Sequence, residues 1–362
     1  MSRNEHENGD ELCEPLAPSK MKPAILSPYS MVQLSLTPAT GYGIFATKDI
    51  PRGTLIAVEA PLVEIPAGTD EESPVAFCIS LQKLTEEDLV RLDNLSCDPA
   101  TLDVVRNGDI RREIHNWYQD NIAMKNPELF SELYDIVALA CQRYSIFLTN
   151  NLSMGVNNGR AVFDFFCRMN HSCRPSIYEH YDKASNRLSI RTLHDIKTGE
   201  EVYSTYIDVL MLRKRRIRKL KAWGFICLCS ACSDDAMEAL CERSIKLDDM
   251  LEEFFFYLDD PSIQTTDDDW PVLKSAKEAL GAAEELASNL VRQGLTGEHL
   301  FIAYKCCSQL CHMILDTDKA LDYARLARDV EIKCVGPDAE LSDLLEASEH
   351  WIMNPDSNRG ET

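Results

Sequence analysis

The chain has 362 residues, of which 45% are hydrophobic and 27% charged, a balance typical of folded domains with a substantial core. The formal net charge of −22 argues against direct nucleic-acid binding, because phosphate recognition needs a basic surface. No apolar run approaches the ~18 residues of a membrane helix, so we expect no membrane partner either. The acidic balance either attracts basic peptides weakly or simply keeps the protein soluble.

The chain begins with a polar leader that is followed by a β-rich segment. Residues 1–24 are polar and acidic, unlike a secretory signal, and we expect them to be disordered. Residues 25–66 alternate Val- and Ile-rich runs with turn residues, which predicts short strands. Gly41-Tyr42-Gly43 separates two of these runs. It fits a tight turn at which backbone approaches a ligand closely, with an ordinary hairpin turn as the alternative.

Residues 67–148 have apolar side chains at helical spacing, and they predict a helical insert. The pattern indicates one of its helices over 104–124. Thr85 is followed three residues later by Asp88, so the pair predicts a capping box at the start of another helix. The insert has no paired C-x-x-C and is therefore expected to bind no metal.

Residues 149–210 return to strand-like patterns, with a predicted hairpin around Ala184-Ser185-Asn186. This region contains the polar segment Asn170-His171-Ser172-Cys173 directly after an apolar run. The segment is either an ordinary turn after a strand or one piece of a site that folding assembles. The Asp208 side chain precedes a long helical pattern, so we expect it to cap the next helix.

Residues 213–221 carry seven basic side chains. Taken alone, the run is typical of a nuclear-import signal or a phosphate-binding patch. Leu212, Ile217, Leu220 and Trp223 nevertheless recur at helical spacing. That spacing favours an amphipathic helix whose basic face is solvated.

The chain has fourteen cysteines and no export signal, which favours reduced thiols or metal ligands over disulfides. Cys227, Cys229 and Cys232 form a C-x-C-x-x-C array that can hold Zn²⁺, although a closed structural site needs a fourth ligand. Cys241 downstream and Cys173 upstream are both candidates. The alternative is three buried cysteines that act as small hydrophobic side chains.

The C-terminal part is predicted to be helical over 235–355, with a disordered tail over 356–362. Two of its segments carry Ala and bulky residues at the spacing of paired antiparallel helices, which favours tetratricopeptide-like packing over an irregular bundle. The predicted helices are 236–258, 272–293, 297–315, 318–334 and 339–350. The fold class expected for the whole chain is α+β.

Four motifs in this order resemble the SET-domain protein methyltransferases, in the branch related to the SET and MYND family. They are Gly41–Ala46, Asn170–Cys173, Gly199–Asp208 and Trp223–Phe225 before the cysteine array. The resemblance implies a β-rich SET core over 25–66 and 149–210, a post-SET helix and zinc cluster over 211–234, and a helical C-terminal domain. The MYND zinc finger is lacking, as in proteins of a kind frequent in fungi.

The same resemblance implies two cofactors, zinc and S-adenosyl-L-methionine. The implied zinc ligands are Cys173, Cys227, Cys229 and Cys232. The implied contacts to the methyl donor are Gly41, Tyr42, Gly43, Asn150, Asn170, His171, Tyr206 and Phe225. Asn151 leaves the register at Asn150 open, and Phe225 is expected to cover the donor.

Tyr206 resembles the catalytic tyrosine of the family, so the implied activity is protein-lysine N-methylation. A strand tyrosine with a satisfied hydroxyl is the alternative. Histone tails and other basic segments are the implied substrates, and we expect a monomer in the nucleus, the cytoplasm or both. The competing interpretation is a non-catalytic SET scaffold that binds partners through its helical tail.

Overall fold

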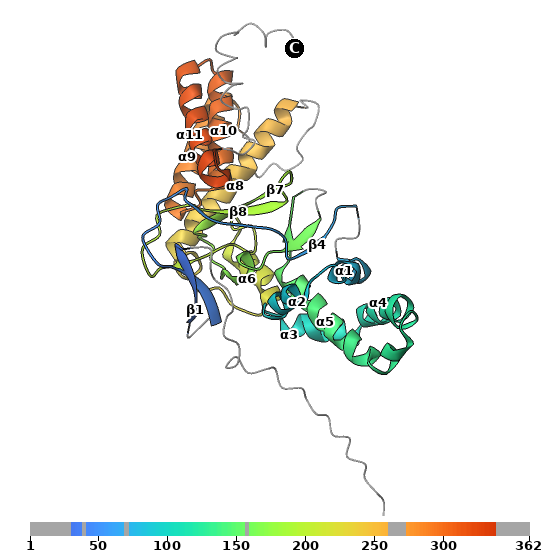
Figure 1. Ribbon diagram of the computed structural model, residues 1–362. Helices are drawn as coiled ribbons and strands as arrows, with labels where there is room; N and C mark the ends of the chain where they lie inside the picture. Colours follow the sequence, from blue (N-terminus) through green and yellow to red (C-terminus); the bar gives the residue numbers. More distant parts are fainter. Residues whose placement is uncertain (1–29, 38–40, 69–71, 156–158, 260–272, 338–362) are drawn as a thin grey trace, which may run out of the picture.

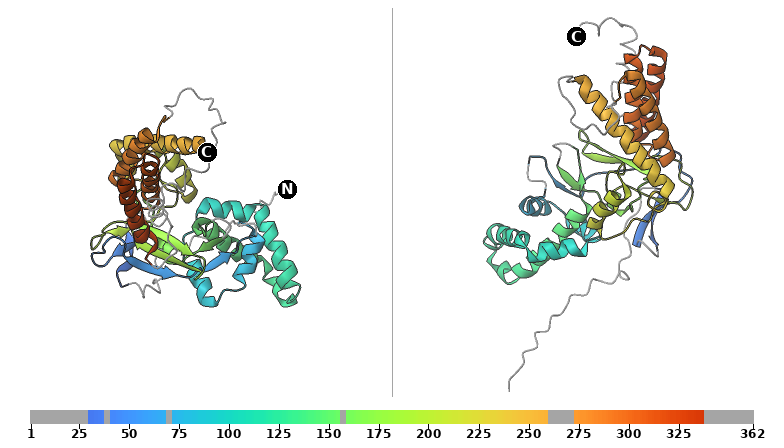
Figure 2. Two further views of the ribbon diagram at one scale, coloured as in Figure 1. Left: turned by 90° about the horizontal axis from the view of Figure 1, so that it is seen from above. Right: turned by 180° about the vertical axis from the view of Figure 1, so that it is seen from behind.

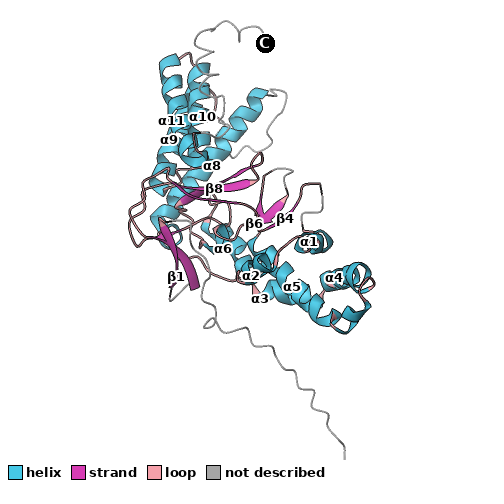
Figure 3. Cartoon of the chain, viewed as in Figure 1, coloured by secondary structure: helices cyan, strands magenta, loops and turns pink. Residues whose placement is uncertain are grey.

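In a computed structural model, the structure describes residues 30–37, 41–68, 72–155, 159–259 and 273–337 (Figure 1). The leader predicted over 1–24, the helix over 339–350 and the tail over 356–362 lie outside these described residues. Within them, helices combine with short antiparallel strands, so the predicted α+β class is confirmed (Figure 3).

The described strands form three small antiparallel sheets, ordered β1-β2-β9, β3-β8-β7 and β4-β6-β5. Each sheet joins strands from before and after the helical insert, so folding brings the two parts of the predicted core together. The bounds are β1 Val32–Thr37, β2 Gly41–Ala46, β3 Leu55–Glu59, β4 Val63–Ile65, β5 Leu152–Ser153, β6 Arg160–Val162, β7 Ile177–Asp182, β8 Arg187–Thr192 and β9 Glu201–Val202. The β7–β8 connection confirms the predicted hairpin.

The turn predicted at Gly41-Tyr42-Gly43 is wrong, because all three residues belong to β2. The antiparallel ladder to β1 runs through them and pairs Gly41 with Thr37. Glycine is nevertheless needed at Gly43, since a Cβ atom there would overlap the Glu201 carboxylate. The close backbone approach that the sequence indicated therefore occurs within a strand.

The insert is helical and packs around an apolar core to which β4 and β6 also contribute. Its helices are α1 Pro74–Leu81, α2 Glu86–Asp93, α3 Pro99–Asn107, α4 Asp109–Tyr118, η2 Gln119–Ala123, η3 Pro127–Ser131 and α5 Leu133–Asn150. The predicted capping box is confirmed, because Thr85 and Asp88 exchange both hydrogen bonds at the start of α2. The single helix predicted over 104–124 is wrong, since Gly108 adopts an extended conformation and separates α3 from α4.

The C-terminal helices stand at one end of the molecule and the insert at another, with the strands between them (Figures 1 and 2). Successive helices α8 to α11 pack on one another around a common apolar core. The remaining bounds are η4 Phe166–Arg168, α6 Arg213–Leu220, η5 Lys221–Trp223, α7 Ser230–Ser233, α8 Asp235–Asp259, α9 Ala276–Gln293, α10 Glu298–Met313 and α11 Thr317–Val335. The amphipathic helix predicted within the basic run is confirmed as α6.

Asp208 does not cap α6, contrary to expectation. The helix begins only at Arg213, and its N-cap residue is Leu212. The Asp208 carboxylate instead accepts a hydrogen bond from the Leu210 backbone at 2.9 Å, and it lies 3.3 Å from the His299 ring. The apolar pattern had suggested that the helix already begins directly after Asp208, four residues too early.

Candidate functional site

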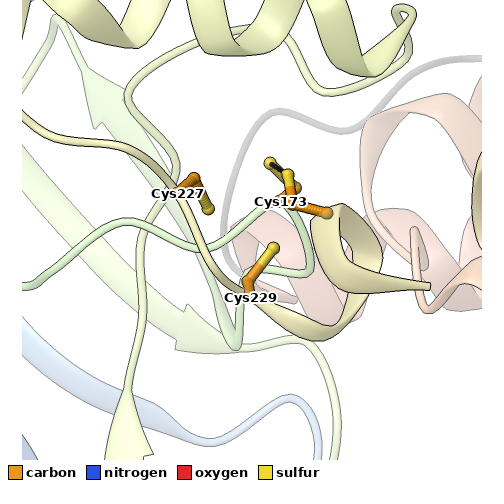
Figure 4. A group of neighbouring side chains, drawn as sticks. Cys173, Cys227 and Cys229 are labelled. Carbon is orange, nitrogen blue, oxygen red and sulfur yellow. Dashed lines mark hydrogen bonds between the residues drawn. The ribbon is translucent and has the colours of Figure 1, made fainter.

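Four cysteine sulfurs gather in one place: those of Cys173, Cys227, Cys229 and Cys232 all lie within 4.8 Å of one another. Figure 4 shows the three labelled side chains turned toward a common centre. The Sγ atoms of Cys173 and Cys232 are 3.5 Å apart. A tetrahedral zinc with Zn–S bonds of ~2.3 Å holds its sulfurs about 3.8 Å apart, so this spacing and this donor set fit the metal.

The cluster joins two segments that are 54 positions apart in the chain, at Cys173 and Cys227. Hydrogen bonds from Cys173, and to a smaller extent from Cys227 and Cys232, lower the pKa of the Cys229 thiol. The arrangement therefore favours a thiolate at Cys229. Cys241, the other candidate for fourth ligand, is not part of the group. Its sulfur lies 3.5 Å from the backbone oxygen of Met211.

A parallel pairing of two backbone segments explains why the polar segment at 170–173 lies beside Tyr206. His171 forms an isolated parallel bridge with Ser204. The Ser204 N–H donates to the oxygen of Asn170, and the Ser172 N–H donates to the oxygen of Ser204, both at 3.0 Å. These bonds hold the two segments in register and therefore bring residues 170–173 next to residue 206.

His171 links the cysteine cluster to Tyr206. The backbone N–H of Tyr206 donates to Nδ1 of His171 at 3.1 Å. A nitrogen that accepts this bond carries no proton, so the ring proton is on Nε2, which lies 3.3 Å from the sulfur of Cys173. The imidazole thus ties a cluster cysteine to the backbone of the predicted catalytic residue.

Beside these residues lies a cavity of about 1330 Å³. Its lining includes every predicted methyl-donor contact except Gly43, namely Gly41, Tyr42, Asn150, Asn170, His171, Tyr206 and Phe225. Residues 94–99 of the insert form another part of the wall. The structure therefore brings the predicted residues together around one space that is large enough for a nucleotide-sized ligand.

Glu201 is the centre of a hydrogen-bond network on the cavity wall, and the sequence analysis did not single it out. Its carboxylate accepts from the Asn170 amide at 2.7 Å and from the Tyr203 hydroxyl at 2.6 Å. The same Asn170 amide also donates to the backbone oxygen of Tyr42 at 3.1 Å. The network fixes the orientation of Asn170 against β2.

Aromatic rings surround Tyr206. Its ring centroid lies 5.3 Å from that of Trp223 and 6.2 Å from that of Phe225, the latter in an edge-to-face arrangement. The Trp223 indole donates to the backbone oxygen of Thr149 at 3.0 Å, which anchors it to the end of α5. The sequence indicated Trp223 as an apolar helix position and as part of the Trp223–Phe225 motif, but it did not assign Trp223 to the wall of the cavity.

The Tyr206 hydroxyl donates to the backbone oxygen of Met169 at 2.9 Å. Burial, with smaller contributions from Cys167 and Glu201, raises the pKa of this hydroxyl above its usual value. The group therefore stays protonated at neutral pH and acts as a hydrogen-bond donor, not as a base.

The structure does not choose between Asn150 and Asn151, because both line the cavity. The Asn150 amide donates to the backbone oxygens of Ser96 and Ile146, at 2.6 and 2.7 Å. The Asn151 amide donates to the backbone of α5, and its oxygen accepts from Arg160 at 2.7 Å. Each side chain already has a structural role at the end of α5.

The family model of the SET domain matches residues 41–207, a range that runs from the first cavity glycine to just past Tyr206. Residues 41–207 are thus similar to SET domains. The matched region contains the described strands β2 to β9. It ends before the C-x-C-x-x-C array, so the array and the C-terminal helices follow the SET domain.

Curated relatives match part of the chain. The Schizosaccharomyces pombe histone-lysine N-methyltransferase set5 is 31% identical over 115 residues, which cover 31% of this chain and 34% of that protein. Human N-lysine methyltransferase SMYD2 is 28% identical over 164 residues, 45% of this chain and 34% of the relative. A SET domain-containing protein L678 of Acanthamoeba polyphaga mimivirus is 24% identical over 53% of this chain and 73% of its own.

The chain thus spans about a third of the length of the set5 and SMYD2 proteins. Among solved structures, Rubisco LSMT bound to AdoMet is 15% identical and covers 90% of this chain and 84% of that one, with a TM-score of 0.36. This likeness is too low to support a conclusion. Over the described residues, no helix has the length and apolar character needed to cross a bilayer.

Proposed function

We propose that the chain is an S-adenosyl-L-methionine-dependent protein-lysine N-methyltransferase in which Tyr206 is the catalytic residue. The observation that carries the proposal is that Tyr206 and the predicted donor contacts line one cavity, beside a cluster of four cysteines. The names of the set5 and SMYD2 relatives support the reaction class. The division of the chain into SET core, insert, post-SET segment and C-terminal domain belongs to the same proposal.

S-adenosyl-L-methionine supplies an activated methyl group on a positively charged sulfur when it is bound. The residues fit such a ligand, because glycine at position 43 leaves room for the Glu201 carboxylate, which holds Asn170 on the cavity wall. Asn170 is oriented on the same wall by Tyr42 and Glu201. The rings of Tyr206 and Phe225 face the same cavity, and aromatic faces near a cation contribute ~0.5–2 kcal/mol each.

The lysine nitrogen must be neutral when it attacks. A free lysine has a pKa near ~10.4, and a desolvating channel lowers that value, so no strong base is required. The protonated Tyr206 hydroxyl, held by Met169, can align the amine with the donor. Alignment of reacting groups contributes up to roughly 7–11 kcal/mol in ideal systems.

Zinc is the metal that we propose for the four cysteines. Four sulfur donors at this spacing match its tetrahedral structural sites. Phe225 lies two residues before Cys227, and Trp223 lies four before it. Fixing the cluster therefore fixes the aromatic wall of the cavity.

Basic protein segments are the proposed substrates, since a chain with a net charge of −22 attracts cations at long range. Histone tails are one such class, in keeping with the printed name of the fission-yeast relative. A nuclear or cytoplasmic location and a monomeric state belong to this proposal.

Calorimetry with S-adenosyl-L-methionine, followed by methylation of a histone and cytosolic peptide array, tests the proposal. We expect stoichiometric binding and transfer of methyl groups to lysine. Absence of binding would favour the alternative, a non-catalytic scaffold that binds partners through its helical tail. No observation on the described residues favours that alternative.

Replacing Asn170 by alanine is expected to weaken donor binding. The change removes the amide that bridges Tyr42 and Glu201, and it leaves a partly buried carboxylate without that donor. A loss of about 1–2 kcal/mol corresponds to a Kd raised roughly 5- to 30-fold. Calorimetry measures this change. Asn121→Ala is the control, because the Asn121 amide donates to the Trp117 backbone oxygen in the insert and does not line the cavity. Equal losses of donor affinity in both variants would contradict the role of Asn170.

The rate of methyl transfer is expected to rise with pH. Deprotonation of the substrate lysine supplies the nucleophile, so kcat/KM should increase by about one log unit per pH unit below the amine pKa. Ionisation of Tyr206 would remove its donated hydrogen bond, and the raised pKa shifts that loss to more alkaline pH. A profile from about pH 7 to about pH 10 should therefore show no falling limb due to Tyr206. A decline in this range that disappears in Tyr206→Phe would contradict the assignment.

A further inference from the structure

One member of the basic run on α6 differs from its neighbours. Lys214, Arg215, Arg218 and Lys219 are exposed on the solvated face of the helix. Arg216 is only 2% exposed, although the run as a whole was expected to be solvated. A guanidinium carries its charge at every physiological pH, so its burial requires compensating partners.

The buried guanidinium lies between the cysteine cluster and α8. Its Nη1 atom donates to the backbone oxygen of Met211 and to the sulfur of Cys241, the latter at 3.4 Å. Its Nη2 atom lies 3.3 Å from the Glu238 carboxylate. Arg216, Cys241 and the cluster residue Cys173 also line one small cavity together.

Arg216 adjoins the cluster as well as an ion-pair partner. Its side chain faces the same small cavity as the cluster residue Cys173 on one side, and it approaches the Glu238 carboxylate on the other. Glu238 has a second basic partner, because the Arg213 backbone N–H donates to it at 2.8 Å and the Arg213 side chain lies 3.8 Å away. Glu238 therefore does not depend on Arg216 alone.

A four-thiolate zinc site needs a cation of this kind. Four thiolates around one Zn²⁺ carry a net charge of −2, and Cys173, Cys227 and Cys232 are buried. A buried anion without a counter-charge is strongly destabilised. His171 directs an N–H toward the sulfur of Cys173 but is neutral in that hydrogen-bonding pattern, so it contributes a dipole and not a charge.

We propose that Arg216 is the counter-cation of the four-cysteine zinc site and a positioning residue that retains the metal there. The inference rests on the proposed zinc binding and adds to it a residue from outside the ligand set. It also accounts for Cys241, whose buried thiol contacts the Arg216 guanidinium and lies outside the ligand group. Groups that contact metal ligands commonly change metal affinity by about 10- to 100-fold when they are removed.

The experiment compares zinc retention by full-length variants. Arg216→Met removes the charge and keeps much of the side-chain length, whereas Arg216→Lys keeps the charge and loses the planar donor group. Arg215→Met is the matched control, since that residue is the exposed neighbour on the same helix. Zinc content is measured by mass spectrometry, and zinc affinity by competition with a chromogenic chelator. Neither readout depends on methyl transfer.

We expect zinc affinity to fall about 10- to 100-fold in Arg216→Met and less in Arg216→Lys, with Arg215→Met unchanged. Wild-type affinity in Arg216→Met, or an equal loss in Arg215→Met, would overturn the proposal. If Arg216→Met does not fold, Arg216→Gln decides, because it also removes the charge but keeps a polar side chain; wild-type zinc affinity in Arg216→Gln would overturn the proposal. A double variant, Arg216→Met with Glu238→Gln, should still lose zinc; restored affinity would trace the defect to an unpaired Glu238 instead. A wild-type protein without zinc would reject the metal site itself, and this inference with it.

Discussion

Tyr206→Phe is expected to reduce kcat for lysine methylation by about 10²–10³-fold while donor affinity stays nearly unchanged. The change removes only the hydroxyl, whose oxygen can accept a hydrogen bond from the amine and align it while its proton is held by Met169. Misplacing reacting groups by about 1 Å already costs about 10²-fold in rate. The ring keeps its contacts with Trp223 and Phe225, so the aromatic wall persists. Single-turnover kinetics with a lysine peptide and calorimetry with the donor separate the two effects.

The backbone oxygen of Met169 loses its donor in this variant, so stability should fall by about 1 kcal/mol. Tyr181→Phe is the control, because its hydroxyl also makes one hydrogen bond, to Asn186 at 2.9 Å, outside the cavity. We expect a similar small loss of stability there with full activity. An unchanged kcat in Tyr206→Phe would mean that the hydroxyl is structural, which is the alternative that the sequence left open.

The parts of the site that sequence reasoning could predict depend on short-range rules. The capping box follows from two residues three positions apart, and it forms as expected. Cys227, Cys229 and Cys232 lie within six residues, so their gathering follows from spacing alone. Resemblance to a family supplied the remaining residues of the cavity, and these line one space in the structure.

Long-range pairing explains what the sequence could not decide. Spacing did not choose between Cys173 and Cys241 as the fourth cysteine, because both are buried small side chains and only backbone register brings Cys173 to the cluster. The turn predicted at Gly41 failed for the same reason, since the ladder with β1 extends the strand through it. Gly108 ended a helix that the apolar pattern continued, which shows that one glycine can outweigh periodicity.

The sequence also did not reveal polar side chains whose partners lie far along the chain. Glu201 and Arg216 stand among exposed charged residues in the sequence, and no periodic pattern distinguishes them. Their partners lie far along the chain, Asn170 for Glu201, and Glu238 and Cys241 for Arg216. Such pairs become visible only when the tertiary contacts are known.

Cys227→Ser is expected to release zinc and to destabilise the whole post-SET segment. A serine hydroxyl is a poor replacement for a thiolate ligand, and a structural zinc bound by cysteines contributes folding free energy directly, on the order of 10 kcal/mol in small zinc domains. We expect zinc content well below one equivalent and a lower melting temperature. Donor affinity should fall as well, because Trp223 and Phe225 lie just ahead of the lost ligand on the cavity wall.

Cys241→Ser is the matched control for this experiment. Cys227 and Cys241 are each 4% exposed, so the two substitutions disturb equally buried sites and differ in cluster membership. We expect Cys241→Ser to lose some stability because it buries a hydroxyl, but to keep its zinc. Added chelator should remove zinc from this variant as it does from the wild type. Equal zinc loss in both variants would show that burial, and not ligation, explains the effect. Full zinc retention in Cys227→Ser would show that this thiolate is not a required ligand. The metal would then not hold the aromatic wall through Cys227, and that part of the proposed function would be wrong.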